Sequence, residues 1–188
     1  MNDPTARASR AATAARDAEG VVQDSMAILQ ATLGQRTPPL PPGALEPRAE
    51  QFFVAGAFFV TPDRRHQMLV GNTGFPPDQR RLLIPIDGGH PGRVIASGQP
   101  LLLHDTRAHP EFRQYLRTAR MGSAVYAPLF DAGVPNGLVI VAAKAFGTLG
   151  QGDLDALVAV AGVVAPRWRA LGGPDWLARA YDRVAPPA

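Results

Sequence analysis

The sequence contains no cysteine, which excludes disulfides, thiolate metal ligands and thiol nucleophiles from this chain. It also lacks an apolar run long enough to span a bilayer, and residues 1–20 lack the apolar core of a signal peptide. We therefore expect a cytoplasmic protein with no membrane partner. The net charge is +3, and the basic residues are scattered instead of forming one stripe, so the sequence gives no support for nucleic-acid binding.

The composition that is present fits one domain with appendages. A chain of 188 residues with 46% hydrophobic content buries one good core and hardly two. Changes in composition divide the sequence into four parts. We expect an N-terminal amphipathic helix over 1–36, a proline-rich linker over 37–44, the main domain over 45–166 and a C-terminal helical extension over 167–188.

The first part has the pattern of one long amphipathic helix. Asp3 is a candidate N-cap, Pro4 suits the first helical position and Gly34 suits the end of the helix. Between these ends, small and apolar residues recur at steps of three and four. Two interpretations stay open at this point: the helix packs on the sheet of its own domain, or it pairs two copies of the chain.

The main domain combines hairpins with short helices. We expect strands over 52–61, 66–72, 81–87, 100–104, 123–130 and 137–146. We expect short helices over 91–98 and 110–118, and a longer one from Leu154 that ends or kinks near Pro166. Pro85 predicts an edge position for the third strand, since proline cannot donate to a ladder. Hairpins without regular βαβ alternation predict the α+β class with an antiparallel sheet.

The order and spacing of several segments carry a family resemblance. These segments are the short glycine-bounded helix over 88–98, the strand closing on His104-Asp105, and the strands over 123–129 and 137–146. Together they resemble a GAF domain that covers roughly 45–165. The resemblance implies a six-stranded antiparallel sheet with helices packed on one face and a ligand pocket on the other, roofed by 90–98 and 110–118. GAF domains are mostly sensors and commonly pair through flanking helices.

Polar residues near the implied pocket are candidates for ligand binding. The candidates are Arg93, Asp105, Tyr115, Arg120, Ser123 and Tyr126. Two guanidiniums and two phenols around an apolar wall favour a small anionic or aromatic ligand. The alternative for each is an ordinary structural role: the tyrosines as core aromatics, and the arginines as solvated groups or as partners of Asp105.

Patterns typical of catalysis or metal binding are missing. Ser97 and Ser123 lack the context of an activated nucleophile, and His104 and His109 are too loosely spaced for a paired helical metal site. Another GAF subgroup reduces free methionine sulfoxide, and its chemistry needs cysteine thiolates, which this chain lacks. We therefore expect neither an enzyme nor a metal site, and the sequence leaves any cofactor unknown.

One motif of cyclic-nucleotide-binding GAF domains, Asn-Lys…Phe…Asp-Glu, is matched only in part. Lys144, Phe146 and Asp153 are present, whereas the asparagine and the glutamate are missing. We expect Lys144 and Asp153 to form an ion pair that joins the last strand to the following helix. That role is architectural, and cyclic-nucleotide binding is disfavoured.

Two functions from different classes fit these features. In the first, the chain is a stand-alone sensory domain that binds a small molecule and, as a homodimer, signals to a separate partner protein. In the second, it is a ligand-free dimerisation or docking module whose pocket is filled by its own side chains. Phe58, Phe75, Phe112 and Tyr126 are bulky enough to fill it.

Overall fold

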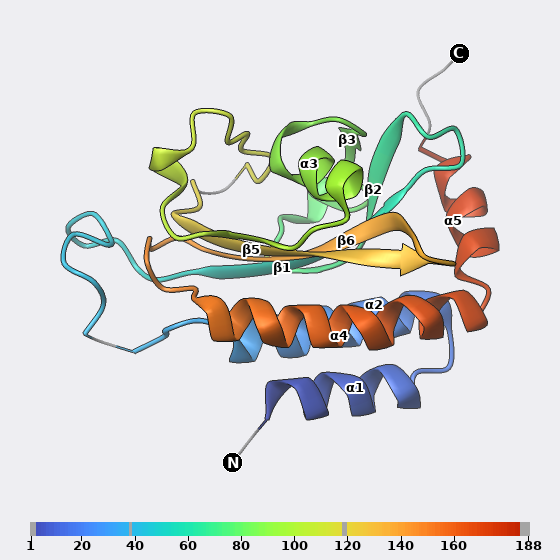
Figure 1. The fold of residues 1–188 in the computed structure, drawn as a ribbon, viewed down its shortest axis with the longest axis horizontal. Coiled ribbons are helices and arrows are strands. Elements are labelled where there is room, and N and C mark those ends of the chain that lie inside the picture. The colour runs from blue at the N-terminus through green and yellow to red at the C-terminus, as the bar shows by residue number, and fades with distance from the viewer. Residues whose placement is uncertain (1–2, 38, 118–119, 185–188) are drawn as a thin grey trace.

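The computed structural model describes residues 3–37, 39–117 and 120–184, which form a six-stranded sheet with helices on both faces (Figure 1). The strands are β1 (Phe53–Val60), β2 (His66–Thr73), β3 (Leu83–Pro85), β4 (Leu101–Leu103), β5 (Ser123–Asp131) and β6 (Val134–Ala143). Their order is β3-β2-β1-β6-β5-β4, and every neighbouring pair is antiparallel. The α+β class and the six-stranded antiparallel sheet predicted from the sequence are confirmed.

The helices lie in layers around this sheet. They are α1 (Pro4–Ala14), α2 (Ala18–Thr32), α3 (Gly89–Ser97), α4 (Gln151–Ala170) and α5 (Gly173–Tyr181), with short 3₁₀ helices η1 (Pro77–Gln79) and η2 (Thr106–Ala108). Helices α2 and α4 lie side by side against one face, and α1 lies beneath them as a further layer (Figure 1). Helix α3 lies over the opposite face. No described helix has both the length and the apolar character needed to cross a membrane.

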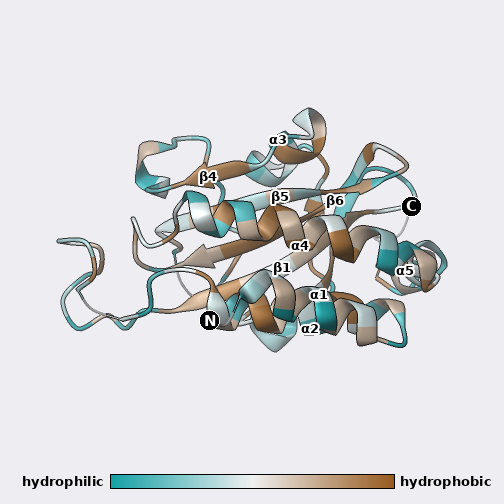
Figure 2. Cartoon of the chain, turned by 60° about the horizontal axis from the view of Figure 1, so that its bottom comes forward, coloured by the Kyte–Doolittle hydropathy of each residue, from teal (hydrophilic) through white to brown (hydrophobic). Residues whose placement is uncertain are grey.

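The sheet separates two apolar cores, because its central strands are covered on both faces. On β1, Ala55, Ala57 and Phe59 pack toward α2 and α4, whereas Val54 and Phe58 pack toward α3. The brown stretches of the central strands behind α4 in Figure 2 reflect this double burial. An unbroken apolar run is the expected pattern for such a strand.

The N-terminal segment forms two helices, which corrects the prediction of one long helix. Helix α1 ends at Ala14, and the next residue, Ala15, has an extended backbone. Asp17 then caps α2 by accepting a hydrogen bond from the amide of Gly20 at 2.7 Å. The chain therefore turns back, and Ala8 and Ala12 are buried within the molecule. The apolar face that could have paired two chains packs inside one chain instead, which favours the first interpretation.

The segment over 110–118 is not helical in its described part, 110–117, contrary to prediction. Two of its backbone groups are bound by a distant side chain: Gln79 donates to the carbonyl of Tyr115 at 2.7 Å and accepts from the amide of Arg117 at 3.0 Å. Backbone groups need partners, and here a side chain supplies them in place of a helical turn. The result is an irregular cover over the sheet.

Helix α4 continues through Pro166 to Ala170, so the predicted end or kink near that proline does not terminate it. Proline removes only one helical donor, and tertiary packing outweighs the loss. Trp168, in the next turn, is 2% exposed and stacks on Phe59 of β1. This contact holds the last turn of α4 on the sheet.

The predicted ion pair between Lys144 and Asp153 is not among the ion pairs of the described residues. Asp153 instead binds two backbone amides, with one carboxylate oxygen 2.8 Å from the nitrogen of Gly34 and the other 2.9 Å from that of Gly150. The carboxylate thus caps the start of α4 and fixes the chain just after α2. Its role is architectural, as expected, but through different partners.

Candidate functional site

An apolar cavity lies between the sheet and a roof formed by α3 and the irregular cover, residues 110–117. Its floor consists of Val54 and Phe58 of β1, Ala124 and Tyr126 of β5, and Ile140 and Ala142 of β6. Its roof includes Pro91, Phe112, Arg113, Tyr115 and Leu116. The cavity offers about 40 Å³ to water-sized molecules, room for a few waters only.

Strand alternation explains why these residues meet. On β5, Ala124 and Tyr126 belong to the core under α3, whereas Val125 and Ala127 belong to the core over α4. The antiparallel register then places Tyr126 opposite Ile140 on β6. The cavity floor therefore consists of even-numbered residues, and their odd-numbered neighbours on β5 face α4.

Two tyrosines supply polar groups to this apolar site. The hydroxyl of Tyr115 is buried and has no hydrogen-bond partner among the described residues. It lies so close to Gly88 that a Cβ atom there would be 2.2 Å from the oxygen. Tyr126 is 3% exposed. Burial, with a smaller contribution from Tyr115, raises the pKa of Tyr126 well above its ordinary value, so its phenol stays neutral.

The structure brings together Tyr115 and Tyr126 of the six predicted site residues and places the other four elsewhere. Ser123 is fully buried and donates to the carbonyl of Ala145 at 2.9 Å, which ties β5 to the chain after β6. Arg93 projects from α3 with a side chain 64% exposed. Neither lines the cavity.

Asp105 and Arg120 are not part of the cavity lining either. Asp105 caps η2 and forms a two-oxygen ion pair with Arg107, which holds the pKa of Asp105 below its usual range. Arg120 is exposed and lines a separate surface groove with Arg107 and Lys144. The predicted pairing of Asp105 with an arginine therefore occurs, but with Arg107.

Aromatic side chains are prominent in the lining of this small cavity. Phe58, Phe75, Phe112 and Tyr126 all line it, the same four side chains that the sequence offers as filling groups. The one guanidinium among the described lining residues is that of Arg113, whose side chain is exposed. The cavity lining is thus mostly apolar, with the buried phenol of Tyr126 and the exposed residue Arg113 among its polar members.

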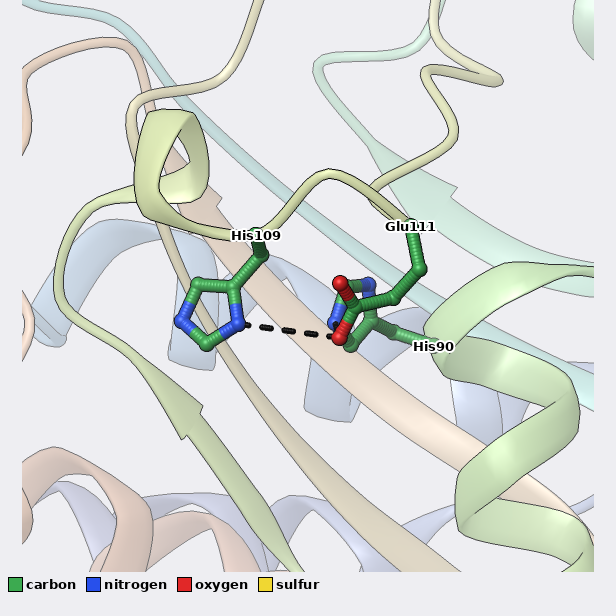
Figure 3. Close-up of side chains that lie close together, drawn as sticks. All are labelled: His90, His109 and Glu111. Atoms are coloured by element: carbon green, nitrogen blue, oxygen red, sulfur yellow. Dashed lines mark ion pairs between the residues drawn. The ribbon is translucent and has the colours of Figure 1, made fainter.

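A cluster of His90, His109 and Glu111 lies beside the cavity and was not predicted from the sequence (Figure 3). His90 belongs to α3, while the other two belong to the segment after η2. The His90 ring lies near the rings of Phe112 and Tyr126, with centroids 5.9 and 6.3 Å away. Burial lowers the pKa of His90, and the charge of Glu111 opposes that effect in part.

Sequence spacing gave little signal for this cluster. His109 and Glu111 are two positions apart, and His90 comes from a different element, so no familiar metal-ligand spacing exists. The available signal was the position of His90 at the glycine-bounded start of a helix that the resemblance places over the pocket.

Residues 48–166 match the protein family described as GAF domain, and the chain belongs to that family. No curated protein sequence matches this chain significantly. Among solved structures, the GAF domain of an Acinetobacter phosphoenolpyruvate-protein phosphotransferase is similar, at 11% identity and a TM-score of 0.73, with 91% of this chain and 93% of that chain covered.

Two further solved structures share the fold. A putative GAF sensor protein from Burkholderia vietnamiensis has 18% identity and a TM-score of 0.68, covering 90% of this chain and 94% of that one. The free methionine-R-sulfoxide reductase from Neisseria meningitidis, in complex with its substrate, has 18% identity and a TM-score of 0.70, covering 90% and 88%. At these identities the similarity establishes the fold alone.

Proposed function

We propose that this GAF domain is a regulatory domain that binds a small aromatic ligand in the cavity under α3. The observation that carries the proposal is the buried hydroxyl of Tyr115, a residue of the cavity lining, which has no hydrogen-bond partner among the described residues. An unpaired buried hydroxyl costs free energy, and a ligand with a polar atom at that point would remove the cost.

Arg113 narrows the ligand class. Arg113 is an exposed residue of the same lining, and a guanidinium there suits a carboxylate held at the surface while an aromatic ring enters the apolar interior. We therefore propose an aromatic acid or a related anion, in line with the small anionic or aromatic ligand expected from the sequence.

Binding requires the cover to move outward. A cavity of about 150 Å³ holds a ring the size of benzene, whereas the cavity here offers about 40 Å³. The cover over 110–117 contains no helix or strand, so its displacement breaks little regular structure. We propose that this displacement is the signal read by a separate partner protein. A homodimer and a cytoplasmic location remain predictions from the sequence.

We propose binding and not catalysis. The similarity to the sulfoxide reductase is one of fold and does not carry its activity over to this chain. The chemistry of that subgroup needs cysteine thiolates, and this sequence has no cysteine.

A second candidate is the docking module with a filled pocket. The small volume and the presence in the lining of all four predicted filling side chains favour it. On this alternative the Tyr115 hydroxyl is simply an unpaired group, and its removal leaves stability unchanged or raises it.

The replacement Tyr115→Phe separates the two candidates. The probes are 4-hydroxybenzoate and benzyl alcohol, titrated calorimetrically into the full chain. We expect 4-hydroxybenzoate to bind more tightly than benzyl alcohol, and Tyr115→Phe to weaken its binding about 5- to 10-fold, the value of one hydrogen bond of roughly 1 kcal/mol. Arg113→Gln should remove the preference for the acid, whereas Arg10→Gln, an exposed change on α1, should change nothing. Absence of binding together with an unchanged or higher melting temperature for Tyr115→Phe would establish the docking module.

A further inference from the structure

The cluster beside the cavity has the donor set of a transition-metal site. His90, His109 and Glu111 each offer one ligand atom, and these atoms all lie within 4.8 Å of one another (Figure 3). Two imidazoles and one carboxylate suit zinc, iron, cobalt or nickel, whereas magnesium and calcium prefer all-oxygen sites.

A bound cation would satisfy the buried imidazole of His90. Its side chain is completely buried, yet neither ring nitrogen has a hydrogen-bond partner among the described residues. Its Nε2 atom lies 3.3 Å from Oε1 of Glu111, but the pair does not meet hydrogen-bond geometry. Buried polar atoms are nearly always satisfied, and an ion bound by both this ring nitrogen and the carboxylate oxygen would satisfy the imidazole.

The distances need little adjustment to accept an ion. Metal–ligand bonds of about 2.1 Å in a tetrahedral site place ligand atoms roughly 3.4 Å apart. The atoms of His90 and Glu111 are 3.3 Å apart, and Nδ1 of His109 lies 3.8 Å from the same carboxylate oxygen. His109 and Glu111 are partly exposed, so a modest shift of their side chains completes the set.

We propose that His90, His109 and Glu111 bind one divalent first-row transition metal ion, which fastens the cover to α3. Three protein ligands leave a coordination position open for water or a further ligand. Because His90 stands on a helix and the other two stand on the irregular segment, the ion crosslinks the two parts of the roof. This proposal rests on residues other than those that carry the aromatic-ligand proposal, and it departs from the expectation of no metal site.

The positive charge of Arg93 lies near the cluster and should weaken the binding of a metal ion there. Its Nη1 atom lies 4.0 Å from Oε1 of Glu111, and its side chain is 64% exposed, so the guanidinium has solvent to move into. A cation held close to the site weakens binding of another cation. Arg93→Gln should therefore tighten metal binding several-fold.

The test uses the full chain, prepared without a histidine tag and stripped with a chelator. Zn²⁺ is titrated by calorimetry, and Co²⁺ is added to the same protein as a spectroscopic probe of ligand number and geometry. We expect one ion per chain and visible Co²⁺ absorption bands. His109→Ala and Glu111→Gln, both at partly exposed side chains, should weaken Zn²⁺ binding at least tenfold, whereas His104→Ala, an exposed histidine outside the cluster, should not.

A second readout tests the crosslink itself. Trypsin cleaves after Arg113 and Arg117 in the cover, and bound Zn²⁺ should slow this cleavage in the unmodified chain but not in Glu111→Gln. Wild-type affinity in both His109→Ala and Glu111→Gln would overturn the site. Stoichiometric binding with an unchanged cleavage rate would overturn the role in fastening the cover.

Discussion

The indole of Trp168 stacks on the ring of Phe59, with ring centroids 3.9 Å apart and planes inclined by 22°. The contact joins the end of α4, beyond Pro166, to the central strand β1. Burial of an aromatic pair of this size is among the larger single contributions that a core contains.

Replacement of this indole should be costly. We expect Trp168→Ala to lower the free energy of unfolding by about 3–5 kcal/mol, because it leaves a cavity against β1. Trp168→Phe should cost less, since it retains a stacked ring and removes an indole N–H that has no hydrogen-bond partner in the described part of the chain. Urea denaturation measures both values. Equal losses for the two variants would contradict the importance of stacking.

Replacing two glycines in adjoining helices by alanine should change the free energy of unfolding in opposite directions. A Cβ atom at Gly173 would lie 2.2 Å from the Trp168 ring, whereas one at Gly162 in α4 would meet nothing within 4 Å. We expect Gly173→Ala to destabilise the protein by about 1–3 kcal/mol and Gly162→Ala to stabilise it by about 0.5–1 kcal/mol. Thermal and urea unfolding give the signs, and destabilisation by both would refute the assignment of free space at Gly162.

Comparing the stability of variants at Asp153 and Lys144 tests the capping role of Asp153. Asp153→Ala removes hydrogen bonds to the amides of Gly34 and Gly150, and we expect a loss of roughly 2 kcal/mol from the cap and the second bond together. Lys144→Met should change stability by less than about 0.5 kcal/mol, because no described ion pair depends on it. A comparable loss in both variants would show that the two side chains pair in solution after all.

Asp63 should make stability depend on pH in acid. A hydrogen bond from the Thr61 hydroxyl, followed by those from Tyr181 and the Arg65 amide, lowers the pKa of Asp63 from 3.8 to about 2. A pKa depressed by folding means that its stabilising effect is complete above the unfolded value and fades as pH falls from about 4 to about 2.

The matched variant is Asp63→Asn. Its melting temperature should lie below that of the unmodified protein at pH 5, and the difference should shrink as pH approaches 2. Circular dichroism melts between pH 2 and 5 provide the comparison. A difference that stays constant over this range would mean that the Asp63 carboxylate is not the group responsible.

The parts of the fold that were predictable are those fixed by local rules. The apolar run of β1 indicated a strand buried on both faces, Pro85 indicated an edge strand, and Gly98, at φ +64°, ends α3 as its sequence position suggested. Strand β6 begins three residues earlier than expected, at Val134, because Ala132 and Gly133 both take positive φ and make a tight turn.

The parts that were not predictable depend on distant partners. Phe112, Tyr115 and Leu116 have helical spacing, yet Gln79, a residue from another part of the chain, binds the backbone of their segment and keeps it irregular. In the same way, only the folded chain brings His90 to Glu111. Of the candidate site, the family resemblance indicated Tyr115 and Tyr126, whereas the cluster of His90, His109 and Glu111 required the folded chain.

The pairing of β1 with β6 bears on how this chain emerges during biosynthesis. Phe53 pairs with Ala143, roughly 90 residues later in the sequence. At about 5–20 residues per second, a ribosome leaves one edge of β1 unpaired for several seconds while the β1–β2 hairpin already exists. That edge carries Ala57, Phe58 and Phe59, so the nascent chain exposes apolar strand surface until the β5–β6 hairpin arrives. Chaperone contact during translation should therefore concentrate on the interval between these two hairpins.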